Sequence, residues 1–105
     1  MTMLKNLPNV DMTAVAAQAA VKLGETPFFP GGNCILNLDE PIGGAGVLLV
    51  EGSADGSTNW STLATLNAAT TAPLHVEISP NPLWIRTRVT TVGTGTLSPT
   101  LEGIQ

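Results

Sequence analysis

The sequence predicts an all-β protein, a small antiparallel β-sandwich, from three observations. Residues 46–66 have the pattern of a hairpin. Residues 83–92 alternate over ten positions between two sets of side chains: Leu83, Ile85, Thr87 and Val89 in one set, and Trp84, Arg86, Arg88 and Thr90 in the other. The 11 glycines and 8 prolines among 105 residues fall mostly between such runs, where they favour turns. We therefore expect short strands joined by tight loops.

The hairpin is the most clearly predicted element. Residues 47–50 are a run of valine and leucine, residues 53–57 are rich in turn formers, and alternation resumes at Trp60. We place the tip at Asp55 and Gly56, because an Asp carboxylate accepts hydrogen bonds from a turn backbone and Gly tolerates positive φ. Trp60 is expected to be buried, with its ring covering one end of the sandwich and removing roughly 150 to 250 Å² from water.

Length and composition predict one domain, with residues 1–13 as an extended N-terminal arm and residues 14–105 as the sandwich. A chain of this size buries somewhat more than about 60% of its unfolded surface, so its core is modest. Cys34 is the only cysteine, which excludes an intrachain disulfide. No stretch approaches the ~20 apolar residues of a membrane helix, and the first eight residues do not form a secretory signal. We expect a soluble protein that is made in the cytoplasm.

Charge is scarce in this chain. Only 11% of the residues are charged, against about 25% in an average domain, and the formal net charge is -4. A net charge of -4 with only four cations gives no electrostatic footprint for nucleic acid, whose phosphates need a basic face, so we expect no nucleic-acid partner and no anionic membrane partner. A neutral, Thr-rich surface is more typical of a protein that packs against other proteins. We expect a homo-oligomer, with a trimer as the first expectation and a dimer as the second.

Residues 1–11 are expected to be the part of the arm that contacts a partner. Leu4, Leu7 and Val10 recur at every third position, and Pro8 prevents a helix. An extended or polyproline-type segment presents such side chains along a groove of the partner.

Residues 12–23 fit two conformations. Their alanine content favours a helix, with Asp11 or Thr13 as the N-cap and Gly24 as the stop. The segment lacks a polar face, however, and we favour a strand over residues 18–23.

The next two segments carry the phenylalanines and the cysteine. Residues 25–33 are bracketed by prolines and are expected to be a loop that inserts Phe28 or Phe29 into the core. Residues 34–38 alternate as a short strand, in which we interpret Cys34 as a small buried apolar residue rather than a nucleophile.

Two further strands are predicted at residues 74–78 and 83–92. The alternation of the first places His75 outside, without partners at the spacing of a metal site. The alternation of the second places three large side chains on one face: Trp84, Arg86 and Arg88. Two such guanidinium groups can clamp a carboxylate or stack on an aromatic ring, or they can be the solvated side of an outer strand. The sequence leaves both possibilities open.

Residues 93–105 are predicted to form a last hairpin. Pro99 lacks the N–H that a central strand donates, so we expect the final strand at an open edge of a sheet. Such an edge can accept a strand from another chain.

Three motifs carry a resemblance to a known class of proteins. They are S-x-D-G-x-x-x-W-x-x-L at residues 53–63, P-x-W-I-R-T-R-V-T at residues 82–90, and T-L-x-x-x-L-E-G at residues 96–103. Together they resemble the small β-sandwich decoration or cement proteins of tailed bacteriophages. The discoidin-like or galactose-binding-like jelly roll shows a similar S-x-D-G-x-x-W motif. The resemblance implies a virion protein that binds the major capsid protein at the outer capsid surface, stabilises the shell, and contacts it through an arm holding Leu4, Leu7 and Val10.

We find no residue pattern that indicates an enzyme, a metal site or a cofactor site, because phosphate loops, nucleophile motifs and metal-ligand spacings are missing. A second hypothesis is a carbohydrate- or ligand-binding β-sandwich module, with Trp84, Arg86 and Arg88 as its recognition surface. The extent of the chain, from Met1 to Gln105, leads us to expect a free-standing subunit and favours the virion hypothesis.

Overall fold

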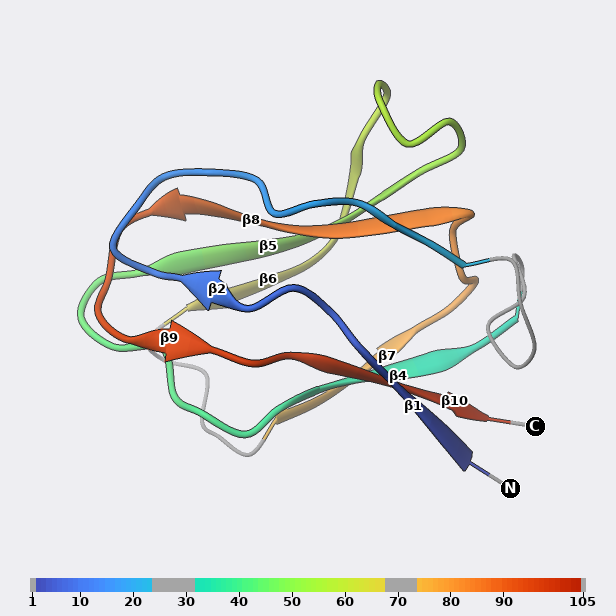
Figure 1. The fold of residues 1–105 in the computed structure, drawn as a ribbon, viewed down its shortest axis with the longest axis horizontal. Helices are drawn as coiled ribbons and strands as arrows, with labels where there is room; N and C mark the ends of the chain where they lie inside the picture. Colours follow the sequence, from blue (N-terminus) through green and yellow to red (C-terminus); the bar gives the residue numbers. More distant parts are fainter. Residues whose placement is uncertain (1, 24–31, 68–73, 105) are drawn as a thin grey trace.

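The chain forms two four-stranded antiparallel sheets and a short two-stranded ribbon (Figure 1). The computed structural model describes residues 2–23, 32–67 and 74–104, and none of these residues lies in a helix. Sheet 1 has the order β1 (Thr2–Asn6), β10 (Thr100–Ile104), β4 (Cys34–Leu38), β7 (Leu74–Ile78). Sheet 2 has the order β3 (Val21–Lys22), β8 (Trp84–Thr91), β5 (Val47–Ser53), β6 (Ser61–Asn67). The ribbon pairs β2 (Val10–Asp11) with β9 (Thr96–Leu97). The predicted all-β fold, a small β-sandwich, is confirmed.

The core lies between the two sheets and is built from alternate residues of their strands. Fully or almost fully buried side chains come from β4, β5, β8 and β10: Cys34, Leu36, Leu38, Leu48, Val50, Ile85, Val89 and Leu101. Cys34 has no exposed surface, and burial raises the pKa of its thiol to about 11. The interpretation of this cysteine as a buried apolar residue is confirmed, since a protonated, enclosed thiol is a poor nucleophile.

The central hairpin is confirmed as the pair of β5 and β6. Leu48 lies opposite Leu66, and Val50 lies opposite Ala64. The register then shifts, so that Leu63 is an extra residue on β6. Such a bulge bends its strand and increases the local twist.

Residues 12–23 run along the edge of β8 without forming a helix. The N–H of Gln18 donates to the Thr87 carbonyl at 2.8 Å, and the N–H of Val89 donates to the Ala16 carbonyl at 2.9 Å. The segment becomes regular at β3, which confirms a strand within residues 18–23. Pairing with β8 decides the conformation, because the alanines alone bury too little surface to stabilise a helix.

The prediction of a separate N-terminal arm is wrong, because the described part of residues 1–13 belongs to the sandwich. β1 pairs with β10 over five residues, and the Leu7 N–H donates to the Pro99 carbonyl at 3.1 Å. Leu7 and Val10 are 4% and 0% exposed, so both are core residues and not side chains presented along an arm. Their spacing of three arises because the chain leaves β1, turns through Pro8 and enters β2.

The prediction that the last strand lies at an open edge of a sheet is also wrong. Pro99 interrupts pairing as its missing N–H requires, and the run splits into β9 and β10. β10 is nevertheless an inner strand, because β1 lies on one side of it and β4 on the other. The edge that we expected to be open is therefore filled by the chain's own first strand.

The predicted phenylalanine loop at residues 25–33 lies largely outside the described residues. Among those that are described, no helix is long and apolar enough to cross a membrane.

Candidate functional site

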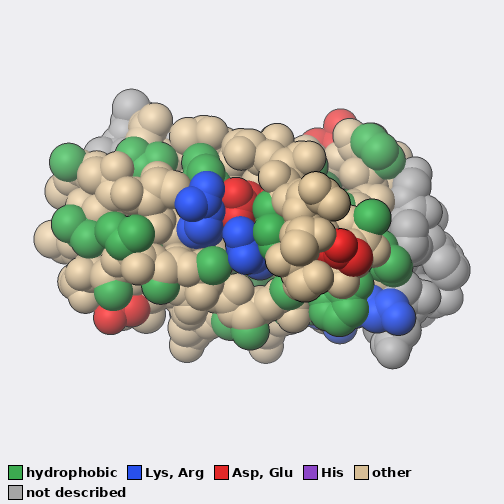
Figure 2. Space-filling view, turned by 90° about the horizontal axis from the view of Figure 1, so that it is seen from above, with side chains coloured by type: hydrophobic (Ala, Val, Ile, Leu, Met, Phe, Trp, Pro, Cys, Tyr) green, Lys and Arg blue, Asp and Glu red, His purple; other side chains and the backbone are tan. Residues whose placement is uncertain are grey.

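The outer face of sheet 2 carries the residues that the sequence singled out. Along β8 the inward side chains Ile85, Thr87 and Val89 are buried, while the outward side chains are half-buried. The predicted alternation of this strand is confirmed, and it places Trp84, Arg86 and Arg88 on one face. The space-filling view shows basic side chains around an acidic one near the middle of the side that it presents (Figure 2).

A buried carboxylate organises this face. Glu51 on β5 lies opposite Arg86 on β8 and is only 3% exposed. Its Oε1 accepts from Arg86 Nε at 2.9 Å and from Arg88 Nε at 3.2 Å, and its Oε2 lies 3.2 Å from Arg88 Nη2. Of the two possibilities for these arginines, the carboxylate clamp is the one that forms. Charge-assisted hydrogen bonds of this kind hold side chains in a fixed geometry.

Trp60 belongs to the same cluster, which corrects its predicted burial in the core. The residue is half-buried, and the Arg86 guanidinium carbon lies 4.1 Å from the centre of its ring. Arg86 therefore makes both an ion pair and a cation–π contact. The indole N–H is buried and has no hydrogen-bond partner among the described residues. The position of Trp60 just past the turn suggested that its ring would lie in the core. The sequence did not indicate that the ring would pack against Arg86 of β8.

The tip of the hairpin contains Asp55 and Gly56, as predicted. The Asp55 carboxylate accepts from the Thr58 hydroxyl at 2.6 Å and from the Thr58 and Ser57 N–H groups at 2.8 and 3.0 Å. These hydrogen bonds, the Thr58 hydroxyl first, hold the pKa of Asp55 well below its usual range. Gly56 has a φ of 78°, and a Cβ there would lie 2.6 Å from Trp84 Cδ2. The turn thus packs closely against Trp84.

Charge is unevenly divided between the strands. The strands of sheet 2 carry three cations, Lys22, Arg86 and Arg88, against the single carboxylate Glu51. The remaining described residues carry one cation and six carboxylates: Lys5, Asp11, Asp39, Glu40, Asp55, Glu77 and Glu102. One strand face of an acidic protein is therefore basic, which the net charge of -4 conceals.

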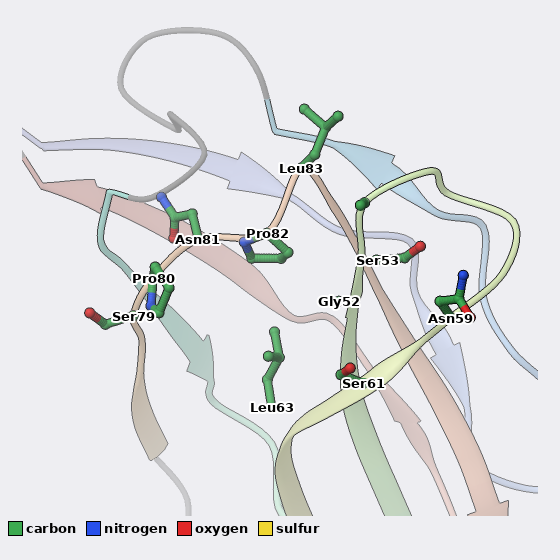
Figure 3. A pocket seen from close by; sticks show the side chains of 11 residues that line it. Gly52, Ser53, Asn59, Ser61, Leu63, Ser79, Pro80, Asn81, Pro82 and Leu83 are labelled. Atoms are coloured by element: carbon green, nitrogen blue, oxygen red, sulfur yellow. The ribbon is translucent and has the colours of Figure 1, made fainter.

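A groove of about 590 Å³ opens beside this face, between the β5–β6 hairpin and the turn that precedes β8. Its walls include Leu63, Pro80, Pro82 and Leu83, with hydroxyl and amide groups around them. Figure 3 shows Leu63 and Pro82 directed toward the space between the two segments. Sequence reasoning missed the groove, because it depends on the extra residue in β6 and on two segments that meet only in the fold.

The remaining candidate residues lie apart from this site. His75 is exposed on sheet 1, as predicted, where its Nδ1 contacts Asn37 Oδ1. Within residues 2–23, 32–67 and 74–104, no three His, Cys, Asp or Glu side chains are grouped to hold a metal ion. Of the three expected arm contacts, only Leu4 is exposed, at 68%.

Comparisons with protein-family models, with curated proteins and with solved structures found no match to this chain.

Proposed function

We propose that this protein is a non-catalytic structural subunit of a virion, a capsid decoration protein that binds the major capsid protein at the outer surface and stabilises the shell. The observation that carries the proposal is the basic outer face of sheet 2. Its arginines are fixed by Glu51, so the face meets a partner with little loss of side-chain freedom. Arg88 remains 42% exposed and is available for a carboxylate on the shell.

Because the described part of residues 1–13 forms no separate arm, we place the proposed shell contact on the outer face of the sandwich rather than at Leu7 and Val10. Leu7 and Val10 are core residues, and the three cations of sheet 2 are the largest concentration of one charge on the described strands. A partner surface with exposed carboxylates fits this face through electrostatic complementarity, which contributes specificity and a faster association rate.

The aromatic residues favour the virion proposal over a carbohydrate-binding module. A sugar-binding platform needs an open ring face, but Arg86 covers the Trp60 ring and the Gly56 turn packs against Trp84. The groove beside Leu63 and Pro82 is the one observation that favours a ligand-binding module as the second candidate. Saturable binding of a small ligand in this groove, with no effect on capsid binding, would support that second function.

The test is co-sedimentation with capsids that lack this protein. Lys22→Glu reverses an exposed charge on sheet 2, and we expect it to weaken capsid binding about tenfold, which corresponds to about 1.4 kcal/mol. The control is His75→Glu on β7 of sheet 1, an exposed position that lies off both sheet 2 and β1, and this variant should bind as the unmodified protein does. Binding should also weaken as salt rises. Equal loss in both variants, or no loss in either, would contradict a shell contact through sheet 2.

A further inference from the structure

The edge strands of the two sheets differ in how well they are protected from pairing with another chain. Bulges, charged residues and short length are the usual protections. β6 is bulged at Leu63, β7 carries Glu77 and the exposed His75, and β3 has two residues. β1 has neither a bulge nor an acidic residue, and it pairs with β10 one-to-one along its length. β1 is as long and as regular as β7, and Lys5 is its one protection, so an exposed apolar residue at its centre is what distinguishes it from β7.

The middle of this edge carries the most exposed large apolar side chain of the described residues. Leu4 is 68% exposed and lies opposite Glu102 on β10. Single exposed leucines are common on monomers. On a regular edge strand, however, an apolar centre removes the repulsion and the desolvation cost that otherwise oppose strand addition.

We infer that β1 pairs antiparallel with β1 of a second copy, across a two-fold axis at Leu4. The two copies of sheet 1 then form one eight-stranded sheet, because each copy contributes four strands. In this register Leu4 lies opposite the second Leu4, Lys5 opposite Met3, and Asn6 opposite Thr2. No like charges lie directly opposite each other. The two Lys5 residues are diagonal neighbours about 7 to 8 Å apart, so the pairing is favoured by the apolar contact between the two Leu4 side chains rather than by charge.

A second copy is the occupant that these residues favour. A two-fold pair is isologous and closes, which leaves β1 with no free edge. Joining β1 of one copy to β7 of another would instead leave a free edge at each end and build an open chain. The inference goes beyond the proposed function and does not rest on it, because the dimer is expected in the absence of any shell. It selects the dimer over the trimer that composition suggested.

The first test is sedimentation equilibrium of the isolated protein at micromolar concentration. We expect a dimer that Leu4→Lys dissociates, with the dissociation constant raised at least about tenfold, because two like charges would lie directly opposite each other. Val15→Lys is the matched control, since Val15 is 66% exposed and lies off β1. This control should remain a dimer. Circular dichroism should show that both variants keep the fold.

The second test is disulfide cross-linking, which reports the register and does not depend on the lysine variant being folded. Leu4→Cys should form a disulfide dimer on oxidation, because the two residues face each other across a strand pair. Asn6→Cys should not, because the two positions would be about 13 Å apart along the strands. Cys34 is buried and does not compete.

Several results would overturn the inference. These are a monomer or trimer of the unmodified protein, an open series of oligomers, a Leu4→Lys dimer, or a disulfide through Asn6→Cys rather than Leu4→Cys. A monomeric protein in which Leu4→Lys abolishes capsid binding would show that β1 accepts a strand of the shell instead. Loss of the dimer with capsid binding kept would separate this inference from the proposed function.

Discussion

The outer faces of the two sheets are held in different ways. On sheet 2, Glu51 is 3% exposed and joins Arg86 and Arg88, so long side chains are fixed within the chain. On sheet 1, Asn37 Nδ2 donates to Glu102 at 3.3 Å, while Leu4 remains exposed at the edge. A fixed charged face and an edge strand with an exposed apolar centre serve different contacts. The first suits a partner of opposite charge, and the second suits a strand.

The largest expected effect separates the two faces directly. Glu51→Ala leaves two arginines without their shared carboxylate. Because their side chains are 22% and 42% exposed and water can solvate them, we expect a cost of about 2 kcal/mol of unfolding free energy. Glu102→Ala is the matched change on sheet 1 and should cost about 1 kcal/mol or less, because it removes one long hydrogen bond. Urea unfolding of both variants measures the difference. Equal costs would show that the two faces do not differ in this way.

The Glu51 cluster also shows where sequence reasoning ends. Alternation over residues 34–38 and 83–92 predicted which side chains face inward, because that information is local to each strand. The partner of Glu51 is set by the register of β5 against β8, and Arg86 is 35 residues away. Both the carboxylate clamp and solvent exposure were compatible with the spacing of the arginines, so only the fold decided between them.

The prediction for the N-terminal segment was wrong for the same reason, because its partner strand is even more distant in the sequence. Leu4 pairs with Glu102 almost a full chain length away, and nothing local to residues 1–13 indicates that partner. An apolar spacing of three is equally compatible with an arm and with a strand that turns into the core. Pro99 correctly predicted a break in pairing, but not that β1 and β4 would enclose β10. Local patterns predicted an extended arm at residues 1–13 and a strand near Pro99, while long-range pairing places the first as β1 at the side of β10.

A second, smaller effect compares the inner and outer sides of β8. Thr87 is 2% exposed on the inner side, and its hydroxyl has no hydrogen-bond partner among the described residues. Thr87→Val keeps the shape and removes an unpartnered polar atom, so we expect about 1 kcal/mol of added stability in urea unfolding. Thr90→Val on the outer, half-buried side should change stability by less than about 0.5 kcal/mol. A destabilised Thr87→Val would show that the hydroxyl is bonded in solution.

The smallest effect tests whether the fixed geometry of sheet 2 extends to the tip of its hairpin. Asp55 accepts hydrogen bonds from three residues around the tip, whereas Asp11, at the end of β2, accepts from Thr13 alone. These bonds lower the pKa of both carboxyls. A lowered pKa in the folded state means that the contribution to stability is present above the unfolded value of about 3.9 and is lost as pH falls below it. We expect the urea midpoint to fall between pH 5 and pH 2, and Asp55→Asn to remove more of that fall than Asp11→Asn does, because its carboxylate holds more donors. If the two variants lose equal parts of the pH dependence, the hydrogen bonds of Asp55 stabilise its turn no more than those of Asp11 stabilise the end of β2. The fixed geometry of sheet 2 would then extend to Trp84 but not to the tip of the hairpin.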